Sequence, residues 1–171
     1  KDLSITNKEF LDLTNRAASW LLSLGGKPES RIFLPHLHSP YAEIMALGIW
    51  NLGGTVVLTD NGSPPKRKDF EILNLISLET NFQKELSKSN PDFTPIFKPN
   101  LLDEAIIFLE KDKGIKLSHY NLLVNANGIQ KSINLQRGTS VKVNLSPNTT
   151  AWVVLQVILP LYTGTELTNK N

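Results

Sequence analysis

Two short apolar segments with one helical segment between them limit the folds that this chain can adopt. Residues 31–34 and 55–58 have the length and the apolar character of buried strands. Residues 39–52 between them have helical spacing, with Pro40 in the first turn and Gly53-Gly54 directly after the last. Strands that are joined through a helix usually run parallel in one sheet. The pattern therefore predicts an α/β domain in which these two strands are parallel neighbours.

A further amphipathic helix is predicted ahead of the first strand. Its apolar side chains recur at helical spacing from Phe10 to Leu24. Thr6 and Glu9 have the spacing of a capping box, and Gly25-Gly26 supplies the stop. We expect this helix to pack its apolar face against the rest of the domain.

The stretch 101–129 predicts a hairpin that leads into a helix. An apolar run, 105–109, meets a polar turn, 110–114, and a second apolar run, 115–117, returns before Ser118 opens the helix. Gly114 suits the positive φ of such a turn. Lys111 and Lys113 beside a glycine and a helix start are compatible with an anion site. A charged hairpin tip is more often only a solvated loop, which is the interpretation we favour.

The rest of the chain alternates short elements with polar connections. Residues 60–68 form a loop that ends in the basic cluster Lys66-Arg67-Lys68, which we expect to be solvated surface. Residues 70–78 fit a short helix or strand, and residues 90–100, with three prolines, fit an extended connector. The remaining predicted elements are a polar helix at 80–89, a helix at 118–133, a strand at 141–145 and a helix at 151–161.

Length and composition describe an ordinary globular domain. The 171 residues are enough for one sizeable core, and the net charge of +2 gives no broad footprint for nucleic acid. No cysteine is present, which excludes disulfides, thiolate nucleophiles and Cys-based zinc sites. The longest apolar stretch, 151–162, is too short to span a bilayer. We expect a soluble, cytoplasmic protein without a membrane anchor.

Several segments of the first third carry a family resemblance. The segments are 13–16 (LTNR), 18–22 (ASWLL), 24–25, 27–28, 39–40 and 48–54 (GIWNLGG), together with Tyr41 and Glu43. They resemble the acyl-adenylate-forming ligases: acyl-CoA synthetases, nonribosomal peptide adenylation domains and luciferases. These are scaffold motifs in that family. The resemblance implies an α/β fold with a partly parallel sheet flanked by helices, like the N-terminal subdomain of those ligases.

The hairpin region also resembles that family, in the part where its members carry a phosphate loop. The flanks AIIFL and LSHYNLL are similar, but five residues stand where the family has a longer Ser-, Thr- and Gly-rich turn that cradles the ATP phosphates. Only Lys113 and Gly114 match the end of that motif, so they are the candidate remnant of a cofactor-binding site. The family uses ATP and magnesium, whereas for this chain we predict no cofactor.

Other candidate site residues have simpler interpretations. The segment 162–166 is similar to the family motif YGxTE, but it follows the 151–161 helix too closely in the chain. His36 and His38 could share one side of an extended segment, but no third metal ligand is spaced nearby. Ser118, His119 and Asp103 cannot form a triad, because adjacent residues do not point at one another. We therefore predict neither catalytic residues nor a metal site.

The sequence is interpreted as one reduced ligase-like domain, 1–171. It comprises a scaffold part, 1–60, a divergent connector, 61–100, and a hairpin–helix and strand–helix part, 101–171. The favoured hypothesis is a catalytically inactive homologue that acts as a binding or protein-interaction module. The alternatives are a fragment of a split or multidomain ligase that is active only with a partner supplying the missing motifs, and a domain that binds a small ligand in an unrelated pocket. The expected partner is a second copy or another protein rather than nucleic acid or membrane, and an acyl or carboxylate compound is the ligand class that the resemblance implies.

Overall fold

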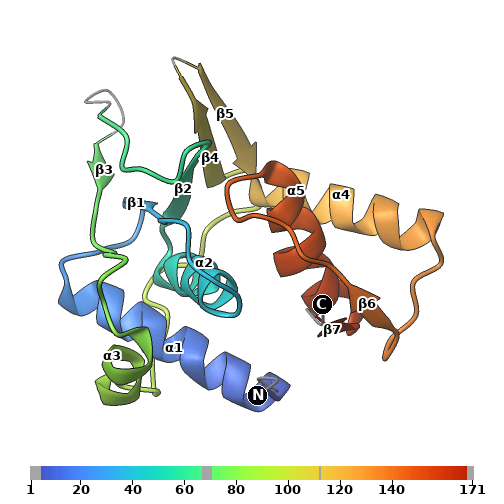
Figure 1. The fold of residues 1–171 in the computed structure, drawn as a ribbon, viewed down its shortest axis with the longest axis horizontal. Coiled ribbons are helices and arrows are strands. Elements are labelled where there is room, and N and C mark those ends of the chain that lie inside the picture. Colours follow the sequence, from blue (N-terminus) through green and yellow to red (C-terminus); the bar gives the residue numbers. More distant parts are fainter. Residues whose placement is uncertain (1–4, 67–70, 112, 169–171) are drawn as a thin grey trace.

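A five-stranded sheet with helices packed against it forms the centre of the protein (Figure 1). The computed structural model describes residues 5–66, 71–111 and 113–168. The strand order is β3-β1-β2-β4-β5, in which β1 to β4 are parallel and β5 is antiparallel. The predicted α/β class is confirmed. The elements of the sheet and its helices are α1 (Asn7–Ser23), β1 (Arg31–Phe33), α2 (Tyr41–Leu52), β2 (Thr55–Thr59), β3 (Ile72–Leu73), α3 (Phe82–Lys88), β4 (Glu104–Glu110), β5 (Lys113–Ser118) and α4 (His119–Ser132).

The predicted parallel pair is present, with α2 as its crossover. Ile32 lies opposite Val56 in the register of β1 and β2. Both strands are buried, because β1 lies between β3 and β2 and β2 lies between β1 and β4. Gly53 ends α2 in the left-handed conformation, with φ of 85°, which a glycine adopts without steric cost.

Helix α1 begins with the predicted capping box between Thr6 and Glu9. It crosses α2 at very short range, since a Cβ added to Gly48 would lie 2.6 Å from Cβ of Ala17. The guanidinium of Arg16 forms an ion pair with Asp12 at 2.7 Å and donates to backbone carbonyls at the end of α3. These contacts tie α1, α2 and α3 into one helical layer.

The segment of the chain between β2 and β4 follows the predictions in outline. Of the predicted segment 70–78, Phe70 lies outside the described residues and residues 72–73 form the short strand β3. Residues 80–89 contain α3, and residues 90–100 form no helix or strand. Arg67 and Lys68 of the predicted basic cluster lie outside the described residues.

The hairpin is tighter than predicted. Strands β4 and β5 pair as far as Glu110 and Lys113, so only residues 111 and 112 connect them. We had expected Gly114 to lie in the turn. It lies instead opposite Leu109 within the ladder. Lys111 has the positive φ, at 50°. The strand pairing therefore extends through residues that we had assigned to the turn.

A second, smaller layer follows the hairpin. Ser118 caps α4, as the sequence predicts, and it does so in a capping box with Asn121. Residues 150–163 form one continuous helix that contains a π-helical stretch and is built from α5 (Thr150–Trp152), η2 (Val153–Ile158) and α6 (Leu159–Thr163). This helix packs against α2 and α4, and Trp152 is fully buried in the main core.

The strand predicted at 141–145 is shorter and starts earlier. It is β6 (Ser140–Lys142), which pairs in parallel with β7 (Glu166–Thr168) in a separate two-stranded sheet. Residues 143–145 leave the ladder, and the backbone N–H of Leu145 donates to Oε1 of Gln156 instead. No helix in the described part of the chain combines the length and the apolar character that crossing a bilayer requires.

Candidate functional site

The hairpin tip holds the residues that match the end of a phosphate loop. Lys113 and Gly114 are both exposed, and both belong to strand β5. Glu110 lies opposite Lys113 in the strand register, so a carboxylate stands next to this lysine. A phosphate cradle needs several backbone N–H groups that converge on one point, as in a loop of successive turns. A paired ladder directs its N–H groups alternately to either side of a strand, so the tip has the geometry of a plain hairpin.

The carboxyl ends of β1 and β2 are covered by the segment 145–149. Ser146 Oγ lies 3.0 Å from Nε2 of His36, Nδ2 of Asn148 donates to the carbonyl of Asp60 at 2.6 Å, and Pro147 is buried. Open α/β sheets usually bind ligands in the crevice beyond these strand ends. Here the chain's own segment occupies that place.

His36 and His38 are not metal ligands in this arrangement. His36 contacts Ser146, and His38 is exposed. Among the described residues, no group of three or more His, Asp or Glu side chains is placed to hold a metal ion.

Ser118, His119 and Asp103 each make contacts of another kind than those of a triad. Ser118 Oγ caps α4 through Asn121, while the ring of His119 packs edge-on against Trp50 with ring centroids 6.0 Å apart. Burial lowers the pKa of His119 below its usual value of 6.5, and the charge of Asp103 acts in the opposite direction without offsetting the burial. Each of these residues is accounted for by structural contacts.

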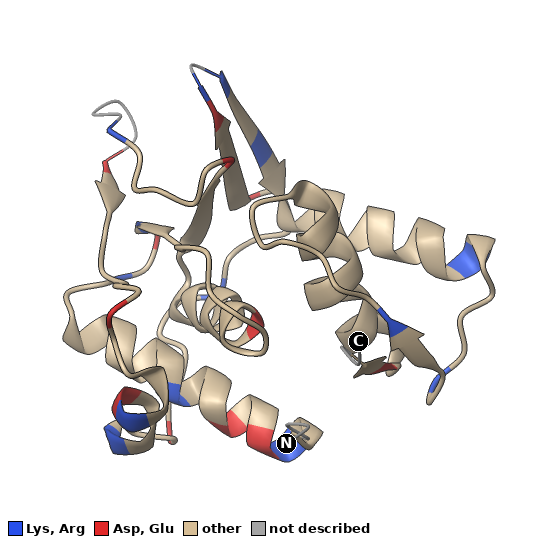
Figure 2. Ribbon diagram, viewed as in Figure 1, with Lys and Arg blue, Asp and Glu red and all other residues tan. Residues whose placement is uncertain are grey.

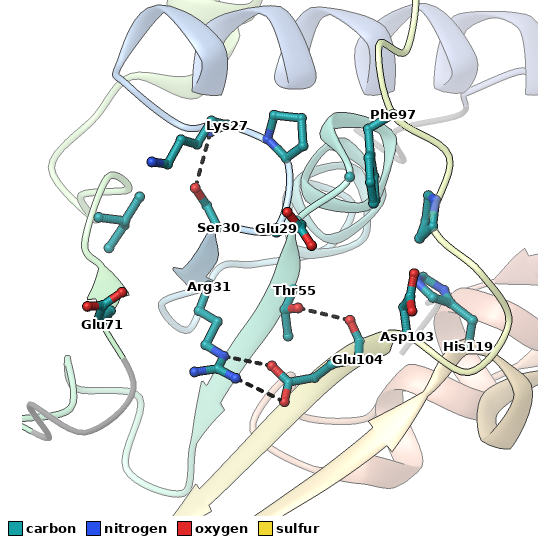
Figure 3. Close-up of a pocket in the computed structure, with 15 residues that line it drawn as sticks. Lys27, Glu29, Ser30, Arg31, Thr55, Glu71, Phe97, Asp103, Glu104 and His119 are labelled. Carbon is teal, nitrogen blue, oxygen red and sulfur yellow. Dashed lines mark hydrogen bonds and ion pairs between the residues drawn. The ribbon is translucent and has the colours of Figure 1, made fainter.

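A cavity of about 660 Å³ lies at the opposite end of the strands from the segment 145–149, beside the amino ends of the parallel strands. Figure 3 shows an ion pair between Arg31 and Glu104 on one side of it, with Nε and Oε1 2.7 Å apart. Oγ1 of Thr55 donates to the carbonyl of Glu104, and Nζ of Lys116 lies 2.9 Å from its Oε2. Burial acts to raise the pKa of Glu104, but the hydrogen bonds and charges of Arg31 and Lys116 outweigh it and leave that pKa lowered.

The opposite wall of this cavity is partly apolar. Phe97, Pro28 and Pro99 line it, and the ring of Phe97 lies so close to Gly53 that an added Cβ would be 2.7 Å away. Lys27, Glu29 and Glu71 stand at its rim (Figure 3). Glu29 has a positive φ of 64°, which is uncommon for a residue with a side chain. The cavity is the place where a small ligand would fit, although its charges do not converge on one point.

Sequence reasoning missed this cavity. Arg31 and Glu104 are 73 positions apart. Arg31 served only to mark the start of a strand, and Glu104 was given no role. The one available signal for the cavity was a charged residue at the first position of each of two buried strands. Parallel strands bring their amino ends to the same end of the sheet, so these two charges would lie close together.

The segment 162–166 lies in the second layer, away from the hairpin tip (Figure 1). Oη of Tyr162 donates to Oδ1 of Asn127, Gly164 ends α6 with a φ of 67°, and Glu166 starts β7. The segment thus connects a helix to a strand.

The sequence matches no protein-family model and no curated protein. The structure, in contrast, is similar to solved ligases. MatB from Rhodopseudomonas palustris, in its apo form, aligns with a TM-score of 0.78 at 16% identity, over 95% of this chain and 39% of that chain. The N-terminal domain of FACL13 from Mycobacterium tuberculosis aligns with a TM-score of 0.79 at 18% identity, over 97% of this chain and 50% of that chain.

A third structure gives the same result. FadD1, a long-chain-fatty-acid-CoA ligase from Archaeoglobus fulgidus, aligns with a TM-score of 0.73 at 16% identity, over 98% of this chain and 41% of that chain. The chain spans two fifths to one half of the length of these three structures. Identity at this level is informative about the fold and leaves activity open. The chain therefore has the fold of the N-terminal part of acyl-CoA synthetases, as the sequence motifs imply.

Proposed function

We propose that this chain is a protein-interaction module with the fold of the N-terminal part of acyl-CoA synthetases, and that by itself it does not form an acyl adenylate. The proposal rests on the resemblance in sequence, the likeness in fold and the geometry of the hairpin. It commits to no catalytic residue and no cofactor.

The observation that carries the proposal is the two-residue connection between β4 and β5. Stabilising a transferred phosphoryl group requires several positioned donors and usually Mg²⁺. The described tip offers the exposed lysines Lys111 and Lys113, with Glu110 beside them. Exposed lysine contacts are screened at physiological salt and contribute about 1 kcal/mol or less each. We therefore expect Mg-ATP to bind no tighter than roughly millimolar.

Isothermal titration calorimetry with Mg-ATP tests this expectation, together with pyrophosphate exchange over a panel of carboxylic acids. We expect no resolvable heat at micromolar ATP and no exchange. Micromolar binding that Lys113→Ala abolishes but Lys84→Ala leaves intact would mean that the short hairpin works as a phosphate site, and would refute the proposal. Lys84 is an exposed lysine on α3 and is the matched control.

A second candidate is a split ligase, in which a partner supplies the rest of the domain. The specific observation in its favour is that the chain covers only half of the FACL13 N-terminal domain. Under this alternative, pyrophosphate exchange would be absent from the chain alone and would appear when the partner polypeptide is added. Coding context identifies the polypeptide to add, namely a ligase-like product encoded beside this chain.

Exposed apolar side chains near the hairpin support an interaction role. Leu101 and Leu102 precede β4, and Tyr120, Leu123 and Val124 follow one another along the outer face of α4. The backbone N–H of Tyr120 donates to the carbonyl of Leu101 at 2.7 Å, so the two groups are adjacent. Contiguous exposed apolar surface of this kind marks sites of protein association.

A further inference from the structure

Charge is divided unevenly along this chain. Residues 113–165 include five Lys and Arg residues and no Asp or Glu, whereas residues 1–112 include 12 basic and 15 acidic residues. Figure 2 shows the effect on the structure, where β5 and α4 carry basic bands and no acidic ones. An asymmetry between the two parts of a chain indicates a charged partner for the biased part.

Strand β5 is the free edge of the main sheet. It is the last strand in the order, and its outer side pairs with no strand of the described chain. Its first four residues are exposed, and half of the Ile115 side chain (51%) is open to solvent. An unpaired edge presents a row of backbone N–H and C=O groups, which is a template for another extended polypeptide.

The side chains of β5 restrict which polypeptide could pair with it. Lys113 and Ile115 are two positions apart, so they lie on the same face of β5, and Lys113 makes no ion pair within the described residues. Lys116 lies on the other face and is already paired with Glu104. Like charges brought opposite one another across a strand pair are destabilising, and opposite charges stabilise. An acidic side chain beside Lys113 and an apolar one beside Ile115 would suit this edge.

The apolar face of α4 continues the same surface. Strand β5 runs into α4 at Ser118, and Tyr120 and Val124 lie on the helix at a spacing of one turn. No acidic residue occurs in α4. We define the β5 face as Lys113, Ile115, Tyr120, Leu123 and Val124.

We propose that the β5 face binds an extended acidic segment of a protein partner, which adds to β5 as a sixth strand of the sheet and places apolar side chains against Ile115 and the face of α4. This inference rests on the proposed interaction function and names the chemistry of its partner. A free strand edge favours a polypeptide over a membrane or a nucleic acid, because only a polypeptide can continue the ladder. A second copy would bring the same basic strand to this edge.

The probe is a capped, fluorescein-labelled peptide in which glutamate and valine alternate on one face of the strand, with serine at the positions between them. Its control is the same peptide with lysine in place of each glutamate. Fluorescence anisotropy gives the affinity, and amide hydrogen exchange locates the site. We expect the acidic peptide to bind, to slow amide exchange in β5, and to be displaced by salt, while the basic peptide does not bind. Methylation of one set of alternate backbone nitrogens, the set that faces β5, should abolish binding, because the ladder needs those N–H groups, whereas methylation of the other set should not.

Lys113→Glu is the diagnostic variant, and Lys84→Glu on α3 is its control with the same change of net charge. We expect Lys113→Glu to lower the affinity for the acidic peptide about fivefold and Lys84→Glu to leave that affinity unchanged. Ile115→Thr keeps strand propensity while it removes apolar contact, and it should also weaken binding. Circular dichroism confirms that each variant is folded.

Three outcomes of the experiments with added ligand would overturn the inference. These are equal weakening by the two charge reversals, protection from exchange outside β5, and binding of phosphatidylserine vesicles or a uridine oligonucleotide through Lys113 with no competition by the acidic peptide. Protection of β5 that appears at high protein concentration without any peptide would instead assign the edge to a second copy and would also overturn it. None of these results depends on ATP binding, so they are distinct from a failure of the proposed function.

Discussion

The indole Nε1 of Trp152 donates a hydrogen bond of 3.1 Å to Oε1 of Glu43, and so joins the helix 150–163 to α2. Nε2 of Gln156 donates to the same oxygen at 2.7 Å. Glu43 is 4% exposed, and its second oxygen, Oε2, has no hydrogen-bond partner in the described structure. A buried polar cluster of this kind fixes how two elements face each other, since any other arrangement would leave more of its groups unsatisfied.

Removing the Glu43 side chain should be far more damaging than neutralising it. Glu43→Ala leaves two buried donors unpaired and a cavity, so we expect a loss of about 3 kcal/mol in the free energy of unfolding. Glu43→Gln retains an acceptor for Trp152 and Gln156 and nearly the same side-chain volume, so we expect a change of about 1 kcal/mol or less. Urea unfolding measures both, with the exposed Glu79→Ala as control. Equal losses for Ala and Gln would show that the charge, and not the acceptor, stabilises this contact.

Two glycines in helices should respond in opposite directions to substitution by alanine. Gly48 faces Ala17 at the α1–α2 crossing, and an added Cβ would lie 2.6 Å away. We expect Gly48→Ala to destabilise by about 1 to 3 kcal/mol, because the two helices must separate. Gly128 in α4 has open space around its Cβ position, so Gly128→Ala should stabilise by about 0.5 to 1 kcal/mol. Thermal melting compares the pair, and a stabilised Gly48→Ala variant would contradict the close crossing.

Acidification should destabilise the protein first through His119. Its folded pKa lies below the unfolded value near 6.5, so the unfolded chain takes up the proton first as the pH falls. The stabilising contribution is therefore complete above about pH 6.5 and is lost as the pH falls through the folded pKa. We expect His119→Gln to reduce the decrease in unfolding free energy between about pH 7.5 and pH 5.5. The exposed His38→Gln is the control, and an equal effect of both variants would rule out burial as the cause.

A second acid-dependent loss should come from Glu104 at lower pH. Its pKa is lowered in the folded state, so its contribution is present above its ordinary value of 4.5 and is lost as the pH falls through the lower, folded value. Glu104→Gln removes the charge that Arg31 and Lys116 share, and we expect it to destabilise by about 1 kcal/mol at neutral pH and to flatten the acid limb below about pH 4.5. Glu110→Gln, at the exposed end of β4, should do neither. Urea unfolding at stepped pH separates the two carboxylates.

The sequence was most informative where local signals agree with one another. The Thr6–Glu9 capping box, the Gly53 stop of α2 and the Ser118 cap of α4 are decided by residues within a few positions, and all three are present. The parallel pairing of β1 and β2 follows from the single helix between them. The likeness to acyl-CoA synthetases in fold was also predicted, from scaffold motifs.

The errors fall where distant residues decide the structure. Strand β6 is three residues long and half-exposed, and its partner β7 lies 26 positions along the chain, so local alternation at 141–145 placed it too late. Gly114 was assigned to the turn because glycine favours turns, whereas the ladder with β4 extends past it. Glu43 counted only as part of a motif, and its contacts with Trp152 and Gln156 depend on how two helices pack.

The strand order also sets a sequence of events during synthesis. Strand β2 is buried along its whole length, but one of its two neighbours is β4, which begins at residue 104. Once residues 55–59 have emerged from the ribosome, the nascent chain can complete the β1–α2–β2 unit. One apolar edge of β2 then remains uncovered. That edge stays open while the ribosome produces the next stretch of chain, which includes α3 and the connector up to residue 103. Closure of the sheet by β4 is therefore late and vectorial, and the interval before it is when this polypeptide most needs a chaperone.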